Sequence, residues 1–256
     1  MRIALSHKDP FVRNLAVRLA GDHKSVSPVV SKHLIRLAAT ETDLENRSQI
    51  AATAKRLPGH TAIPMIEGLL KSGDDATDAD IPLLIWWAIE AKAETDRDKV
   101  LDMFQRPAVW KSKTIQNTVL KRLIQRYVMA GGNANFIAAA RLIELAPSKN
   151  AAKELISGLS EGLRGRDLIG LSPALAKAIK PYQNELFGGP LALGIRQGKT
   201  GAVEKAILVI ADPKADPQQR LAYARLLGES GQKKAVPALL KIVQTSGSSA
   251  ALKQTA

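Results

Sequence analysis

The chain has 256 residues and a formal net charge of +13, from 37 basic and 24 acidic side chains. The absence of cysteine excludes disulfides, thiolate metal sites and a cysteine nucleophile, and no apolar run is long enough to predict a membrane span. Aromatic residues make up only 4% of the chain and alternating β-branched runs are nearly absent, so the composition predicts an all-α protein. The basic balance favours anionic partners, among them nucleic acids and acidic proteins.

Apolar periodicity, interrupted by glycine and proline, predicts helices along the whole chain. The first pair covers 9–21 and 27–40, and the second covers 44–57 and 61–71. An acidic loop, 73–80, leads to a helix that is apolar on nearly every side and is therefore expected to be buried. The core-facing apolar positions of the first helix are predicted to be Val12, Leu15, Ala16 and Leu19. Later helices are predicted at 96–104, 114–128, 134–146, 148–163, 172–180, 184–196 and 201–211, with a last pair inside 216–243.

One sequence pattern occurs near both ends of the chain. The segments 9–21 and 216–228 align without a gap and share Asp, Pro, two Arg, Leu and Gly. A looser and longer copy covers 43–59. The recurrence of one pattern predicts structural repeats, each made of two antiparallel helices.

Each recurring residue type has an expected structural role. The aspartates are predicted to accept hydrogen bonds from free N–H groups at helix starts. The arginines four positions later are predicted to reach that carboxylate or the acid of a neighbouring repeat, and the glycines to end the helices. The predicted repeat-structural residues are therefore Asp9, Arg13, Gly21, Asp43, Arg47, Gly59, Asp216, Arg220 and Gly228.

The D-P-x-V-R start, the R-L-x-G end and the V-P-A-L-L segment at 236–240 resemble HEAT-like repeats of the phycobilisome-lyase type. The resemblance implies a right-handed α-solenoid of about six HEAT-like antiparallel helix pairs. It also implies a single repeat domain over 1–256, which we expect to be a segment excised from a longer protein. Such repeats serve as scaffolds in unrelated proteins, so the resemblance implies an architecture and not an activity.

A second resemblance rests on the run DIPLLIWWAIE at 80–90, downstream of a D-P-x-V-R-N-x-A-V-R-L helix. This arrangement is similar to the helical-repeat segment of large bacterial secreted proteins that join a propeller dehydrogenase-like domain to a c-type cytochrome domain. The chain itself has no C-x-x-C-H motif and no propeller repeat. The resemblance therefore implies a connector without redox chemistry, in a periplasmic or exported parent protein.

Five residues are candidates for contact with a partner. One indole of the Trp86–Trp87 pair is expected in the core and the other on a groove or between layers, because adjacent helical residues point in different directions. The basic cluster near residue 121 fits either a solvated face or a site for phosphate or an acidic partner. The predicted partner-binding residues are Trp87, Trp110, Lys121, Arg122 and Arg126.

The sequence predicts no catalytic, cofactor-binding or metal-binding residue. The four histidines lack the spacing of a helical metal motif, and no serine stands in a nucleophile elbow. The leading hypothesis is a non-catalytic scaffold that binds a protein partner. The alternative is a nucleic-acid-binding or base-excising HEAT-like protein of the alkylpurine glycosylase kind, with Asp80, Asp102 and a tryptophan in one groove. A passive spacer is the third possibility.

Overall fold

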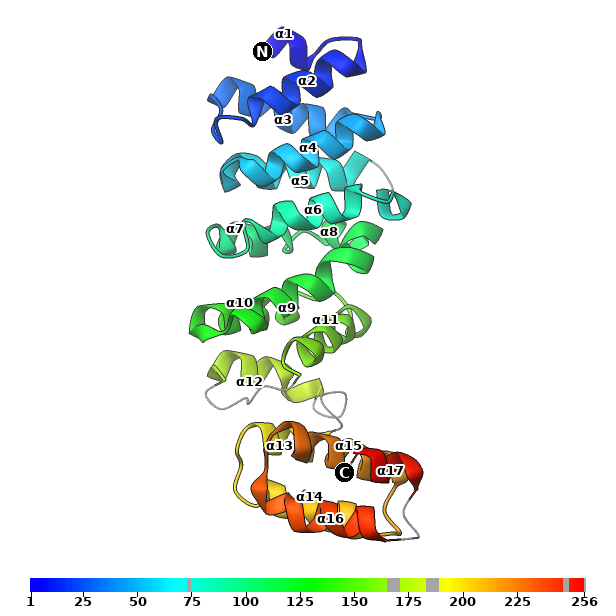
Figure 1. The fold of residues 1–256 in the computed structure, drawn as a ribbon. Coiled ribbons are helices and arrows are strands. Elements are labelled where there is room, and N and C mark those ends of the chain that lie inside the picture. The colour runs from blue at the N-terminus through cyan, green and yellow to red at the C-terminus, as the bar shows by residue number, and fades with distance from the viewer. Residues whose placement is uncertain (73–74, 165–170, 183–188, 246–248, 256) are drawn as a thin grey trace. The chain divides into compact units, whose positions relative to one another are not determined.

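The fold is known from a computed structural model, which describes residues 1–72, 75–164, 171–182, 189–245 and 249–255. All regular elements in these ranges are helical and none is a strand, which confirms the predicted all-α class (Figure 1). The contacts group the chain into two units, residues 1–158 and 159–256. In the described ranges, no helix has both the length and the apolar character that crossing a bilayer requires.

Two rows of helices form the N-terminal part of the first unit. In one row, α2 (Pro10–Ala20) packs on α4 (Leu44–Arg56), and α4 packs on α6 (Ile81–Glu90). In the other row, α3 (Pro28–Thr40) packs on α5 (Gly59–Ser72). Figure 1 shows these helices as successive layers. The four helices predicted for the first two pairs are therefore present, with ends that agree to within a few residues, and α4 also packs on α5.

The rest of the first unit consists of shorter helices. They are α1 (Arg2–Leu5), a 3-10 turn (Asp75–Thr77), α7 (Arg97–Met103), α8 (Pro107–Lys111), a π-helical segment (Ile115–Val119), α9 (Leu120–Ala130), α10 (Gly132–Glu144) and most of α11 (Lys149–Gly162). α1 contacts α2 and α3, and α7 contacts α5 and α10. The single helix predicted at 114–128 thus begins with a π-helical segment, which the apolar period did not indicate.

The second unit is a smaller group of helices. They are α12 (Pro173–Ile179), a 3-10 turn (Lys180–Tyr182), α13 (Pro190–Arg196), α14 (Ala202–Ala211), α15 (Pro217–Glu229), a 3-10 turn (Lys233–Ala235), α16 (Val236–Gln244) and α17 (Ala250–Thr255). α14 packs against α13, α15 and α16, and α17 packs against α15 and α16. Ala206, Ile210, Ala224 and Leu227 are completely buried between them. α15 and α16 lie where the last two helices were predicted, but each packs on α14 and α17.

Aspartate begins each of the three repeat helices, as predicted. The side chain accepts a hydrogen bond from a backbone N–H group in the first turn, which would otherwise have no partner. The three bonds are each 2.9 Å long and join Asp9 to Phe11, Asp43 to Asn46 and Asp216 to Gln219. In α2 and α15 a proline follows the aspartate, at a position where its missing N–H group costs nothing.

Only one of the three glycines predicted to end helices does so. Gly21 is the C-terminal cap of α2. Gly59 instead begins α5, where a Cβ atom would collide with the carboxylate of Asp96. Gly228 lies inside α15, and the left-handed conformation after this helix belongs to Gly231, with a φ of +59°. The pattern therefore identified a close approach at Gly59 and an ordinary helical position at Gly228, not two caps.

α2 buries only part of the apolar stripe that was predicted for it. Leu15 and Leu19 are 47% and 49% exposed, whereas Ala16, Val17 and Ala20 are buried. The small residues lie on the buried side because α2 packs closely on α4, and small side chains let two helix backbones approach. The prediction was therefore right for Ala16 and wrong for Leu15 and Leu19, the two large apolar side chains that it placed inward.

Candidate functional site

An arginine in the first helix pair binds a carboxylate that precedes the second pair. The Nε and Nη2 atoms of Arg13 donate to the two carboxylate oxygens of Glu41 at 2.7 and 2.8 Å. Glu41 follows α3, is 3% exposed, and also accepts from the backbone N–H groups of Thr42 and Asp43 at 3.1 Å. Burial alone would raise the pKa of Glu41, but the hydrogen bonds from Arg13 and from the backbone lower it below its usual value. Glu41 therefore joins α2 to the start of α4.

The second helix pair repeats this arrangement with Arg47 and Asp75. The Nε atom of Arg47 donates to Oδ1 of Asp75 at 2.9 Å, and its Nη2 atom donates to Oδ2. Arg47 also donates to the carbonyls of Glu41 and Leu69 at 3.0 and 2.8 Å. In both pairs the carboxylate lies 28 residues after the arginine. Arg13 and Arg47 thus each bind a distant carboxylate, as predicted. The carboxylates belong to Glu41 and Asp75, however, and not to the aspartates that begin the helices.

Arg220 does not follow this rule in the described part of the chain. Its Nε and Nη2 atoms both donate to the carbonyl of Ile210 at 3.1 Å. The residue 28 positions later is Ser248, which has no carboxylate and lies outside the described residues. The third copy of the pattern therefore keeps the arginine but uses it to bind the end of the preceding helix, α14.

Two carboxylates that follow α6 in the chain, Glu94 and Asp102, pair with arginines of α9 and α10. The Nη2 atom of Arg126 lies 3.2 Å from Glu94, and the Nη2 atom of Arg141 lies 2.8 Å from Asp102. All four side chains are partly or fully exposed, so each pair contributes less than about 1 kcal/mol to stability. These contacts nevertheless place a carboxylate beside Arg126, a residue predicted to bind an anionic partner.

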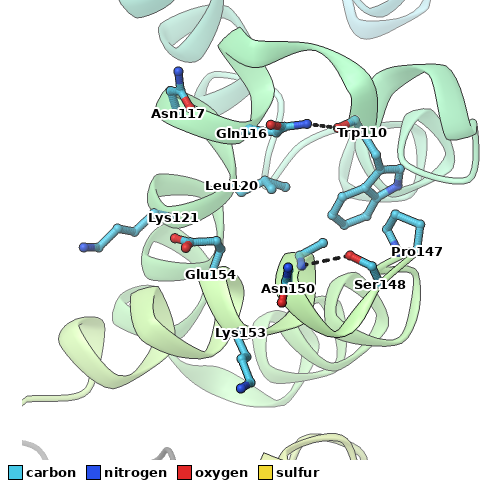
Figure 2. Close-up of a pocket in the computed structure, with 11 residues that line it drawn as sticks. Trp110, Gln116, Asn117, Leu120, Lys121, Pro147, Ser148, Asn150, Lys153 and Glu154 are labelled. Atoms are coloured by element: carbon cyan, nitrogen blue, oxygen red, sulfur yellow. Dashed lines mark hydrogen bonds between the residues drawn. The ribbon is translucent and has the colours of Figure 1, made fainter.

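A pocket of about 610 Å³ lies between α8, the π-helical segment, α9 and the start of α11 (Figure 2). It is lined by Trp110, Gln116, Asn117, Leu120, Lys121, Pro147, Ser148, Asn150, Ala151, Lys153 and Glu154. We call it the Trp110 pocket. Trp110 and Lys121, two of the five predicted partner-binding residues, both line it, so the structure brings these two together.

Trp110 is fixed in the wall of this pocket. Its Nε1–H group donates to the carbonyl of Phe104 at 2.7 Å, and the two rings meet edge to face with centroids 5.4 Å apart. The amide of Gln116 donates to the carbonyl of Trp110, also at 2.7 Å. Because its only donor is already bound, the 5%-exposed indole offers a ligand apolar contact and no hydrogen bond.

The π-helical segment shapes one side of the Trp110 pocket. A π turn contains one residue more than an α turn, and such segments are frequent at functional sites. Ile115 and Val119 are completely buried, while Gln116 and Asn117 line the pocket. On the opposite side, Gly158 lets α11 approach α9, because a Cβ atom there would lie 2.9 Å from the carbonyl oxygen of Lys121.

The rim of the Trp110 pocket is polar and carries charges of both signs. Figure 2 shows Lys121 and Lys153 extending outward from the pocket, with Glu154 on the α11 side. The Ser148 hydroxyl accepts from the N–H group of Ala151 at 3.2 Å, so it caps the start of α11. An apolar wall with a small number of polar groups at its edge is typical of sites that bind an organic ligand or a protein side chain.

The other predicted partner-binding residues lie elsewhere. Trp87 is 43% exposed on α6, with the Nζ atom of Lys55 5.6 Å from its ring centroid, whereas Trp86 is 8% exposed. The core indole predicted for this pair is therefore Trp86, while Trp87 is about half exposed. Arg122 is exposed and donates to the carbonyl of Thr118 at 2.9 Å. Neither Trp87, Arg122 nor Arg126 lines the Trp110 pocket.

In the described part of the chain, the pocket that Asp102 lines does not include Asp80, the other acid proposed for a base-excising groove. Asp102 lines a pocket of about 240 Å³ with His60 and Arg106, and no tryptophan lines it. Asp80 precedes α6 but makes no capping bond with its side chain. Asp78 accepts instead from the N–H groups of Asp80 and Ile81, each at 2.9 Å, and these bonds lower the pKa of Asp78.

Two parts of the site were missed by sequence reasoning. The carboxylates of Glu41 and Asp75 could have been found, because an acid recurs 28 residues after the arginine in the first two copies. The α11 side of the Trp110 pocket, with Asn150 and Glu154, carries no signal in the sequence, since it depends on how α11 packs against α9. In the described ranges, no group of three or more histidine and acidic side chains could hold a metal ion.

Comparisons of the chain with protein-family models, with curated proteins and with solved structures found no match.

Proposed function

We propose that this protein is a non-catalytic helical-repeat interaction module that binds a segment of a protein partner in the Trp110 pocket. The observation that carries the proposal is the pocket itself, an open cavity of about 610 Å³ with an indole wall and a polar rim. Cavities of roughly 300–1,000 Å³ accommodate ligands and side-chain clusters. The partner would place an apolar side chain against Trp110 and Leu120 and its polar groups against Gln116, Asn117 and Asn150.

The proposed mode of binding follows from what each part of the pocket offers. Buried apolar anchors that fill a concave site account for most of the affinity in protein interfaces, and a polar rim excludes water around them. The bond from Trp110 to Phe104 holds the indole in one orientation, so little side-chain entropy is lost on binding. Lys121 and Lys153 at the rim favour a partner segment with a carboxylate beside its apolar anchor.

The HEAT-like repeat class is also part of this proposal. Its support is the aspartate at each helix start and the arginine that reaches a carboxylate 28 residues later in the first two pairs. The single domain over 1–256, the right-handed solenoid of about six pairs and the role as connector in a larger exported electron-transfer protein stay predictions. Sequencing the open reading frame on both sides of this segment tests the connector, which requires flanking C-x-x-C-H and propeller repeats.

A substitution that fills the pocket tests the proposed function. Ala151→Arg places a long side chain inside the Trp110 pocket, and Ala130→Arg makes the same change at an exposed residue outside it. We expect one stoichiometric protein partner to co-purify from the native source with the wild type and with Ala130→Arg, and to be lost with Ala151→Arg. Circular dichroism checks that both variants remain helical. Equal recovery with both variants would place the interaction elsewhere, and the absence of a partner in all three would favour a passive spacer.

A second candidate, binding or excision on nucleic acid, is favoured by the net charge of +13. Affinity for phosphates falls steeply with salt, because binding releases counterions. A duplex-binding titration at several salt concentrations separates the two candidates. Dissociation constants at or below about 1 µM at physiological salt, with a steep salt dependence, would favour nucleic acid, whereas negligible binding would remove it.

A further inference from the structure

The second unit contains a basic pocket of its own. This cavity of about 610 Å³ lies between the last turn of α11, the end of α13 and one face of α15. It is lined by Ser160, Arg164, Arg196, Ala222, Arg225, Leu226 and Glu229. We call it the Arg196 pocket. Three guanidinium groups therefore surround one cavity that contains a single carboxylate.

Arg196 forms the interior of this pocket and is held in place by its neighbours. Its side chain is 6% exposed. One Nη atom donates to the carbonyl of Leu163 at 3.1 Å, and the other lies 3.4 Å from a carboxylate oxygen of Glu229. A guanidinium fixed in this way presents its charge at a defined position without losing further side-chain entropy when a ligand binds.

Arg164 and Arg225 add two further positive charges to the pocket. Both are exposed, and in the described residues neither forms an ion pair with a carboxylate. Arg225 stands four residues before Glu229 on α15, so both side chains project from the same face of the helix. Counting Glu229 against the three arginines leaves the pocket with a formal charge of +2.

Ser160 provides an independent observation that points to a ligand. Its hydroxyl oxygen is buried in the wall of the Arg196 pocket and has no hydrogen-bond partner among the residues that the structure describes. A buried hydroxyl without a partner lowers stability. A ligand oxygen inside the pocket would supply the missing bond.

We propose that the Arg196 pocket binds a small organic phosphate monoester in its dianionic form. The two negative charges of such a group match the +2 charge of the pocket, and arginine forks fit the oxygens of a phosphate. Ala222 and Leu226 leave an apolar wall for the organic part, and the volume exceeds what the phosphate alone would occupy. This site lies in a different unit from the Trp110 pocket. The phosphate proposal therefore does not depend on the proposed protein partner.

Calorimetric titration of the full chain with phenyl phosphate and with benzoate tests this site. We expect saturable 1:1 binding of phenyl phosphate at pH 7.5 and physiological salt, with benzoate about tenfold weaker because it carries one charge instead of two. The affinity for phenyl phosphate should fall as the pH drops below about 6, where the phosphate group takes up a proton. The charged groups that face the ligand are Arg164, Arg196, Arg225 and Glu229, and no histidine lines the pocket.

Substitutions locate the binding. Arg164→Gln and Arg225→Gln should each weaken phenyl phosphate about tenfold, and Ser160→Ala should weaken it a few fold. Lys241→Gln, on the exposed surface of α16 in the same unit, removes one positive charge outside the pocket and should leave the affinity unchanged. The proposal is overturned by the absence of saturation up to about 10 mM ligand, by equal binding of benzoate, or by an equal loss in Lys241→Gln, which would indicate diffuse charge attraction only.

Discussion

Arg47 and Asp75 form a buried ion pair with two hydrogen bonds, across 28 residues of chain. The side chains are 2% and 5% exposed, and two backbone carbonyls accept from two further N–H groups of the guanidinium. Such extensive pairing explains how a full positive charge is tolerated in the core of a helical protein.

Removing one member of this pair should be strongly destabilising. Asp75→Ala leaves the guanidinium of Arg47 buried without its carboxylate, and we expect a loss of about 3–5 kcal/mol in the free energy of unfolding. Arg126→Ala is the matched control, because its pair with Glu94 is 31% and 63% exposed and should contribute less than about 1 kcal/mol. Urea denaturation measures both. A loss below about 1 kcal/mol for Asp75→Ala would contradict the role assigned to this pair.

Glu41 should make stability depend on pH in the acidic range. Its pKa is lower in the folded protein than in the unfolded chain, where a glutamate has a pKa of about 4.3. The stabilisation is therefore fully present above that value and is lost as the pH falls through the lower, folded pKa. We expect the free energy of unfolding to decline as the pH is lowered from about 5. Glu41→Gln should be less stable at pH 7 and should decline less, and an identical decline in the variant would refute the assignment.

Two glycines near the end of α15 should respond to alanine in opposite ways. Gly228 lies inside the helix, and a Cβ atom there would meet nothing within 4 Å, so Gly228→Ala should stabilise by about 0.5–1 kcal/mol. Gly231 has a φ of +59°, so Gly231→Ala should destabilise by about 1–2 kcal/mol. Thermal unfolding of the two variants compares them directly. If Gly228→Ala were the more damaging, α15 would have to end at Gly228, as the sequence pattern suggested.

The exposed leucines of α2 should tolerate polar replacement. In the second copy of the repeat pattern, 34 residues further along the chain, the positions of Leu15 and Leu19 are occupied by the polar residues Gln49 and Thr53. The Thr53 hydroxyl donates to the carbonyl of Val17 at 3.2 Å. The double variant Leu15→Gln, Leu19→Thr should therefore keep the free energy of unfolding within about 0.5 kcal/mol of the wild type. Leu34→Ala, at a completely buried position, should cost about 2–5 kcal/mol. A comparable loss in the double variant would mean that Leu15 and Leu19 are core residues.

The sequence predicted local structure well where the signal was local. The aspartates at helix starts, the ends of α2 to α5 and the division of Trp86 from Trp87 follow from capping chemistry and apolar period, which depend on neighbouring residues only. For α2 the prediction was right for Ala16 but wrong for Leu15 and Leu19, which are about half exposed. Which side chains of a helix are buried depends on how closely the neighbouring helix approaches, and the sequence of one helix alone does not determine that distance.

The candidate sites were less accessible to sequence reasoning for the same reason. Trp110 and Lys121 were selected by residue type, and the structure places both in one pocket. The π-helical segment beside them has the apolar pattern of an ordinary α-helix, so the sequence did not indicate its π-helical turn. Arg196 and Arg225 come together only through the packing of α13 and α15, and neither stands in a recognisable motif.

Because the carboxylate partners of Arg13 and Arg47 each belong to the connection into the next layer, tension on the chain would be resisted at discrete points. Pulling the N-terminal part of the first unit apart end to end would require breaking one buried charge contact for every layer removed. Each rupture would release about 34 residues, or roughly 115 Å of extended chain. Under load, this region would therefore extend in steps of similar length. The largest force would be needed to break the ion pair between Arg47 and Asp75.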